Sequence, residues 1–143
     1  MFRSFPLLLV ALIVYNLIAA AHGFDYDGTV GLLHKGVDIT MFSGKPWTFT
    51  IGDLVVLVAL ALLFVEVVKS TRTGATEIIN HALSMLVVII AVVEFIAVKA
   101  CATSPFFFLT AMTVFDITAG FTISIVAARR DLGEGGALFG SGN

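Results

Sequence analysis

Three carboxylates lie inside stretches of this sequence that are otherwise apolar: Asp116, Glu94 and Glu66. An Asp at the centre of a membrane-spanning helix costs about 2.5–3.5 kcal/mol, so such a side chain is usually turned toward protein and given a partner. Intramembrane acids of this kind carry protons or cations in some proteins and join helices by hydrogen bonds in others. The sequence therefore poses the question of which role these acids have.

The three acids are predicted to lie at different depths. A helical rise of 1.5 Å per residue puts Asp116 close to the midplane, Glu94 about 8 Å toward one face and Glu66 about 9 Å toward the other. His81 enters its helix at the level of Glu66. Because no single side chain spans a hydrocarbon core of ~30 Å, a proton relay needs titratable groups spaced in this way.

Around Asp116, small and polar residues follow a 3–4–4 spacing: Thr113, Asp116, Gly120 and Ser124. That spacing places them on one helical face, which we expect to be turned toward protein. Gly120 and Ser124 also form a small-xxx-small pattern, which permits close approach of two helices. The stripe is therefore the predicted packing seam of its helix.

Partners for the acids are available elsewhere in the chain. Tyr15 and Asn16 put two hydrogen-bonding groups midway along the first apolar stretch and are possible partners of Asp116. A buried carboxylic acid can also stay protonated, since desolvation disfavours its charged form, and then act only as a hydrogen-bond donor between helices. Glu66 is three residues from Lys69 and can extend toward the membrane surface to pair with it.

The composition explains why the acids stand out. The 143-residue chain is 59% apolar and 13% charged, with a mean hydropathy of +1.06, values that lie outside the range of water-soluble domains. Its net charge of −2 and its lack of a basic patch argue against nucleic-acid binding. We predict an all-α membrane protein, a four-helix bundle in a lipid bilayer, with helices at about 4–22, 51–69, 77–98 and 105–128.

The first apolar stretch has two interpretations. Arg3 near the start and Ala19-Ala20-Ala21 at the end resemble a cleavable signal peptide. The apolar run, however, continues through Leu17 and Ile18, which is long for a signal peptide. We expect an uncleaved anchor.

The basic residues predict an orientation. Lys and Arg in short loops are more frequent on the cytoplasmic side. Five of them fall on one side of the predicted bundle and three on the other, which places both termini in the cytoplasm of a bacterial inner membrane and residues 23–50 outside. The two groups are Arg3, Lys69, Arg72, Arg129 and Arg130, and Lys35, Lys45 and Lys99.

The outer segment contains a predicted β-hairpin at 37–51. Apolar residues alternate with polar ones on both sides of a turn at 43–46, which is typical of two short strands. We expect its apolar face, led by Trp47, to rest on the outer end of the bundle or among lipid headgroups. The stretch 23–36 contains four glycines and is predicted to be irregular.

Local signals mark the helix ends. Thr50 and Asp53 have the spacing of a capping pair for the second helix, and Ser104 before Pro105 is a predicted N-cap for the fourth. The sequence at 73–77 is predicted to open the third helix. Residues 1–132 then form one domain, and 133–143, with five glycines, are predicted to be a disordered tail.

Other reactive residues carry weaker signals. The single cysteine, Cys101, excludes an internal disulfide and serves either as a helix-end filler or in an intermolecular bridge. The acidic and histidine residues of the outer segment follow no recognised metal-binding pattern, and we expect neither a metal nor a cofactor. No nucleophile and base pair, phosphate loop or metalloprotease motif is present, so no enzyme is indicated.

Three stretches resemble small uncharacterised four-helix bacterial inner-membrane proteins: FVEVVKSTRTG at 64–74, NHALSM at 80–85 and FDITAGF at 115–121, followed by ARRD at 128–131. The resemblance covers the last three helices and implies architecture and compartment, but no activity. Small multidrug exporters are similar in size, but their essential glutamate lies in the first helix, which here carries no acid.

Two functions remain open at this stage. The first is a non-enzymatic, oligomeric proton or cation channel or transporter that uses Asp116, Glu94 and Glu66. The second is an accessory or assembly subunit of a larger membrane complex, in which the acids lock helices together and the hairpin docks a partner.

Overall fold

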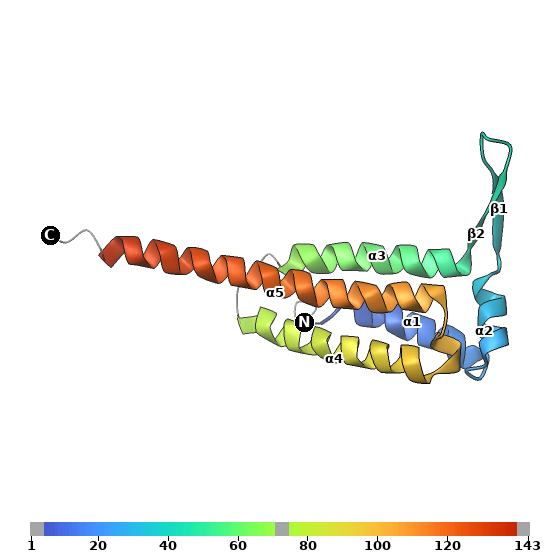
Figure 1. Ribbon diagram of the computed structural model, residues 1–143, viewed down its shortest axis with the longest axis horizontal. Helices are drawn as coiled ribbons and strands as arrows, with labels where there is room; N and C mark the ends of the chain where they lie inside the picture. Colours follow the sequence, from blue (N-terminus) through green and yellow to red (C-terminus); the bar gives the residue numbers. More distant parts are fainter. Residues whose placement is uncertain (1–4, 71–74, 140–143) are drawn as a thin grey trace.

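The computed structural model describes residues 5–70 and 75–139. Within them the chain forms α1 (Leu8–Ala21), α2 (Tyr26–Leu33), β1 (Gly36–Thr40), β2 (Pro46–Thr50), α3 (Ile51–Ser70), α4 (Ala75–Ala97), the 3₁₀ turn η2 (Lys99–Cys101) and α5 (Ser104–Phe139) (Figure 1). The helices α1, α3, α4 and α5 run side by side, with α5 between α3 and α4 (Figure 1). The result is a helical bundle with α2 and a two-stranded sheet at one end, which we call the arm end.

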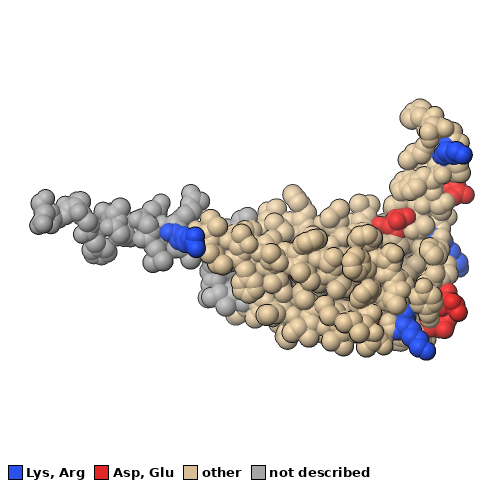
Figure 2. Space-filling model, in the orientation of Figure 1, with Lys and Arg blue, Asp and Glu red and all other residues tan. Residues whose placement is uncertain are grey.

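Three helices are long and apolar enough to cross a membrane, Ile51–Ser70, Ile79–Ala97 and Ser104–Ile123. The helix α1 is shorter than the predicted 4–22, and it reaches a fourth span only together with α2, from which it is bent by 119°. The bend follows Gly23 and Phe24, which both have φ near +60°. Figure 2 agrees with this assignment, because the visible face of the bundle carries no Lys, Arg, Asp or Glu between its two ends.

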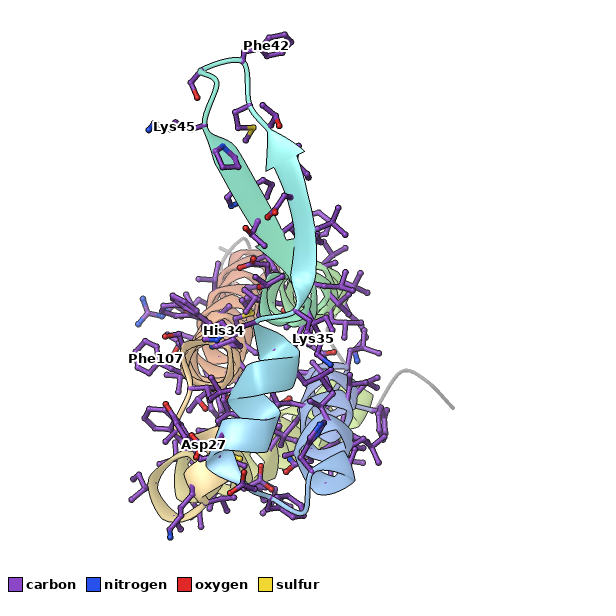
Figure 3. All side chains as sticks on the ribbon, turned by 90° about the vertical axis from the view of Figure 1, so that its right-hand side faces the viewer. Asp27, His34, Lys35, Phe42, Lys45 and Phe107 are labelled. Atoms are coloured by element: carbon purple, nitrogen blue, oxygen red, sulfur yellow. The ribbon has the colours of Figure 1, made fainter. Side chains whose placement is uncertain are left out.

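The helix α2 was not expected, since the sequence predicts an irregular segment at 23–36. It crosses the arm end of the bundle at a steep angle to the bundle helices (Figure 3). Asp25 caps it by accepting a hydrogen bond from the backbone N–H of Gly28 at 2.9 Å, and Thr29 and Leu33 are buried against the bundle. Capping and burial at these positions outweigh the helix-destabilising effect of the glycines, about 1 kcal/mol each.

The predicted hairpin is present. β1 and β2 pair antiparallel, with Val37 opposite Phe49 and Ile39 opposite Trp47, so these four side chains share one face. Of the two predicted places for this face, contact with the outer end of the bundle holds only at the hairpin base, and a place among lipid headgroups stays a prediction. The hairpin extends away from the bundle to a tip at Phe42 and Lys45, and only the residues at its base are half-buried (Figure 3).

The last helix differs from its prediction at both ends. Thr103 rather than Ser104 precedes it, with the Thr103 carbonyl accepting from the N–H of Phe107 at 2.9 Å. Its backbone remains helical to Phe139, where a disordered tail was predicted from 133. Adding residues to an existing helix avoids the cost of nucleation, so glycines can be accommodated. Residues 140–143 lie outside the described residues, as do 71–74 at the predicted start of α4, which begins at Ala75.

Candidate functional site

Glu66 is the centre of a polar cluster at the end of the bundle opposite the arm. Its side chain is 1% exposed. Oε2 accepts the backbone N–H of Leu7 at 2.8 Å, and Oε1 accepts the side-chain amide of Asn80 at 2.7 Å and pairs with Lys69 Nζ at 2.9 Å. The carboxylate thus joins the start of α1, the end of α3 and the first turns of α4.

This position suits a carboxylate for a second reason. The residue that precedes α1, Leu7, has no side-chain cap, so Glu66 supplies from α3 the negative charge that a helix N-terminus favours. Lys69 also donates to the carbonyl of Phe5 at 2.9 Å. The expected pairing of Glu66 with Lys69 is present, but the carboxylate is buried among helices rather than extended toward the membrane surface.

Asp116 is 6% exposed, so its side chain faces protein, as the spacing in its helix predicts. It lies beside Ser84 of α4, and the ionisable groups near enough to act on its charge are Glu66, His81 and Lys69. Ser84 Oγ is buried and makes no hydrogen bond of good geometry with any described residue. Asp116 therefore belongs with the Glu66 cluster, and together they form what we call the inner polar cluster.

The packing seam predicted around Gly120 has a specific partner. The imidazole of His81 lies directly against Gly120, and a Cβ added there would come within 2.7 Å of His81 Nδ1. The same ring stacks on Phe121 with 5.6 Å between centroids. Thr113 is buried and donates to the carbonyl of Thr110 in its own helix at 2.7 Å. The side chain of Ser124 lies outside the described part of the chain.

Glu94 belongs to a separate group nearer the arm end. Its Oε2 accepts the side-chain amide of Asn16 at 2.9 Å, which links α4 to α1. Tyr15 donates to the carbonyl of Ala100 at 2.8 Å and is hydrogen-bonded to Thr103 Oγ1 at 2.5 Å. Asn16 and Tyr15 are therefore not the partners of Asp116 that the sequence allowed.

A largely apolar layer separates the two polar groups; Thr110 and Thr113 of α5 are buried in it and donate to carbonyls of their own helix. Ser84 and Glu94 are ten residues apart on α4, about 15 Å along the helix, and the buried residues between them on that helix are Val87 and Ala91. The other helices add buried apolar side chains to this core: Leu12 of α1, Ala59 of α3, and Leu109 and Met112 of α5. Within the described residues the acids thus form two groups rather than one evenly spaced series.

The outer segment and the cysteine offer little reactive chemistry. No group of three metal-ligating side chains occurs in the described part of the chain. Asp25 is occupied as the cap of α2. Cys101 is buried, and desolvation, together with the charge of Glu94, raises the pKa of its thiol to about 11.

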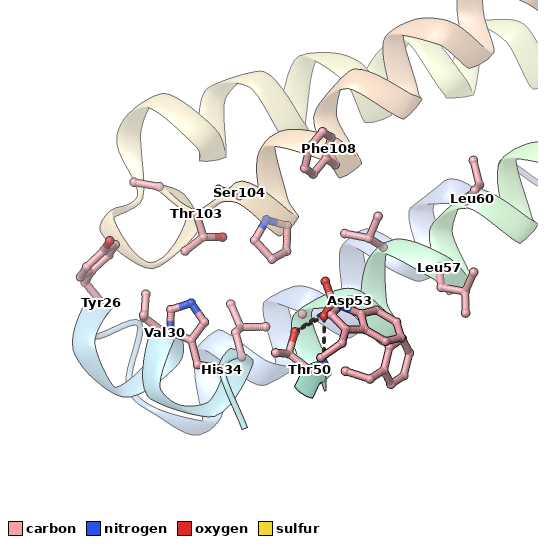
Figure 4. Close-up of a pocket in the computed structure, with 17 residues that line it drawn as sticks. Tyr26, Val30, His34, Thr50, Asp53, Leu57, Leu60, Thr103, Ser104 and Phe108 are labelled. Carbon is pink, nitrogen blue, oxygen red and sulfur yellow. Dashed lines mark hydrogen bonds between the residues drawn. The ribbon is translucent and has the colours of Figure 1, made fainter. Parts of the chain in front are cut away.

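A pocket of about 750 Å³ opens in the corner between the hairpin and the bundle (Figure 4). Its walls come from α2, β2, the first half of α3 and the start of α5. Asp53 lies in it, and accepts the backbone N–H of Thr50 at 2.9 Å and its hydroxyl at 2.7 Å, as the predicted capping pair requires. Sequence reasoning identified Asp53 only as a helix cap, because the pocket depends on segments far apart in the chain.

No family model, no curated protein and no solved structure matches this chain. The assignment of a function therefore depends on the geometry of the chain itself.

Proposed function

We propose that this protein is a non-enzymatic subunit of a larger complex in the bacterial inner membrane. The bundle anchors it, the buried acids hold its helices together, and α2 with the hairpin binds a neighbouring membrane protein at the outer surface.

The contacts of the acids support a structural role. Glu66 has a donor or a cation at both carboxylate oxygens, and Glu94 is bonded to Asn16 on another helix. A carboxylate that is fully paired within one chain is suited to joining helices, since losing its partners would leave a buried charge unsatisfied. Between the two polar groups the described residues add no buried acidic or basic side chain, only threonines bonded within their own helix, which makes passage of a proton through the single chain unfavourable.

The exposed hairpin supports the binding role. An isolated two-stranded hairpin is marginally stable in water, and this one exposes apolar side chains along its length, among them Val37 at 69% and Phe42 at the tip. Such a surface is typical of an interaction site when it continues beyond the body of the protein. Phe42 and Met41 at the tip are the first candidates for contact with a partner.

The basic residues support the orientation. Lys35, Lys45 and Lys99 lie at the arm end, while Lys69 and Arg129 lie toward the opposite end. Arg3 and Arg72, on which an excess of basic residues at that opposite end depends, lie outside the described residues; from the five-to-three distribution expected from the sequence we assign the arm end to the outside and both termini to the cytoplasm.

Purification in a mild detergent tests the proposal. The parent protein is expected to elute with a stoichiometric partner, and the paired change Met41→Ser and Phe42→Ser is expected to release that partner while far-UV circular dichroism stays unchanged. Phe64→Ser on the bundle surface, where the side chain is 71% exposed, is the matched control and should keep the partner. A parent protein that purifies without any partner would contradict the proposal.

One observation favours the second candidate, an oligomeric proton or cation pathway. Asp116 lies close enough to Glu66, His81 and Lys69 for their charges to act on it. Proton pathways use clusters of titratable side chains of this kind. Because four helices enclose little space, such a pathway would lie between subunits. In reconstituted vesicles Asp116→Asn should then abolish flux with little change in stability or oligomer size, and a parent protein without flux would eliminate this function.

A further inference from the structure

The corner pocket at the arm end combines two kinds of lining at different depths (Figure 4). Leu57, Leu60 and Phe108 line the side of the pocket that lies farther from the arm end, toward the membrane interior. Each is about half exposed, so this side opens onto the surface that lipid tails would cover. Asp53 and His34 line the side nearer the arm end, at the level of the membrane surface. Asp53 and Leu60 are seven residues apart on α3, about 10 Å, which is close to the depth of a lipid headgroup and the first part of its chains.

The charge of the pocket is negative. Among the described residues that line it, Asp53 is the only acidic one and none is Lys or Arg. Its Oδ2 accepts both bonds from Thr50, whereas its Oδ1 accepts none from any described residue. A carboxylate oxygen is therefore free to accept a hydrogen bond from a ligand.

Two aromatic rings share the pocket with this carboxylate. Trp47 and Phe49 of β2 line the same pocket, with 5.7 Å between their ring centroids. Indole rings favour the interface between lipid and water, and aromatic faces attract cations. Trp47 and Phe49 thus form the hairpin side of the pocket, and α2, α3 and α5 form its other sides.

We propose that this pocket binds a phospholipid of the outer leaflet whose headgroup carries a primary amine. The ammonium donates to Asp53 Oδ1 beside the ring of Trp47, and an acyl chain lies along Leu57, Leu60 and Phe108. A primary ammonium both carries charge and donates hydrogen bonds, whereas a trimethylated one cannot donate and an anionic headgroup is repelled.

The single tryptophan of the chain makes this binding measurable. Trp47 lies in the pocket, so lipids with brominated chains quench its fluorescence when they occupy the site. The purified full-length protein is placed in phosphatidylcholine nanodiscs, and brominated phosphatidylethanolamine, phosphatidylglycerol or phosphatidylcholine is added in increasing fractions. Because Asp53 is exposed, its ion pair with the lipid ammonium adds little binding free energy. We therefore expect half-maximal quenching at an about threefold lower fraction of phosphatidylethanolamine than of the other two lipids.

Two variants test whether Asp53 causes the preference for phosphatidylethanolamine. Asp53→Asn removes the charge but keeps an oxygen that caps α3, and it should bring phosphatidylethanolamine to the level of phosphatidylcholine. Asp38→Asn is the matched control, because Asp38 is also exposed and bonded to a threonine, Thr48 at 2.6 Å, but lies outside the pocket. That variant should keep the preference of the parent protein.

Three results would overturn the inference. Equal quenching by all three lipids is the result expected if a protein segment or another apolar molecule fills the pocket. A preference that survives Asp53→Asn, or one that both aspartate changes abolish, would remove the specific role of Asp53. Since the measurement uses the purified protein alone, it is independent of the proposed partner.

Discussion

Replacement of Glu66 by glutamine tests most sharply whether the acids join helices. The change keeps the shape of the side chain and one carbonyl oxygen, but removes the charge and one of the acceptors. The glutamine oxygen can keep either the interactions of Oε1 with Asn80 and Lys69 or that of Oε2 with Leu7, but not all three, and its amide group carries no charge for Lys69.

The size of the effect follows from the burial of Glu66. Removing one member of a buried ion pair costs 3–5 kcal/mol when the other charge is left without compensation. Lys69 is 15% exposed and retains the carbonyl of Phe5, so we expect the lower end, a loss of about 3 kcal/mol in the free energy of unfolding. Glu94→Gln is the matched control. Glu94 is half-buried and has one interhelical hydrogen bond, whose acceptor oxygen glutamine keeps, so the free energy of unfolding should fall by no more than about 0.6 kcal/mol.

The assay is reversible unfolding in mixed micelles with increasing sodium dodecyl sulfate, followed by far-UV circular dichroism. The double change Glu66→Leu with Lys69→Leu should be less destabilising than Glu66→Leu alone, since no buried charge is then left without its partner. A loss for Glu66→Gln no larger than that for Glu94→Gln would refute the assignment of Glu66 as the main link between α1, α3 and α4.

Three further predictions concern packing, reactivity and orientation. Gly120→Ala should lower the free energy of unfolding by about 1–3 kcal/mol, because its methyl group overlaps an imidazole, while Gly31→Ala, which meets open space, should not; chemical unfolding compares them. Cys101 should react slowly with maleimide at neutral pH and faster as the pH rises toward 11, since its raised pKa keeps the thiol protonated; rapid labelling of the folded protein at neutral pH would contradict this. In intact cells and a cysteine-free background, an impermeant maleimide should label Ser43→Cys but not Arg129→Cys, and the reverse pattern would invert the orientation.

Features that depend on neighbouring residues could be predicted from the sequence. The hairpin follows from alternating side chains around a turn, and the cap formed by Thr50 and Asp53 involves residues three apart. The inward direction of Asp116 follows from the energetic cost of a carboxylate in lipid. These inferences need only the periodicity of the side chains, their spacing along the chain and the fact that the surrounding solvent is lipid.

Features that depend on how helices meet could not be predicted. The partner of a buried acid is set by the rotation and crossing of several helices, which is why Asn16 binds Glu94 instead of Asp116. The helix α2 forms despite its glycines because burial of Leu33 and Thr29 stabilises it. That burial exists only in the assembled bundle, so the local sequence does not indicate it. No local pattern indicates the corner pocket, whose walls come from four separate segments.

The most direct test of the proposed role is photo-crosslinking from the hairpin tip in native membranes. A photoreactive amino acid replaces Phe42 at the tip in one strain and Phe64 on the bundle surface in another; both side chains are exposed. We predict a defined protein adduct from position 42 and only lipid adducts from position 64. Lipid adducts alone from both positions would contradict a role for the hairpin in binding a partner.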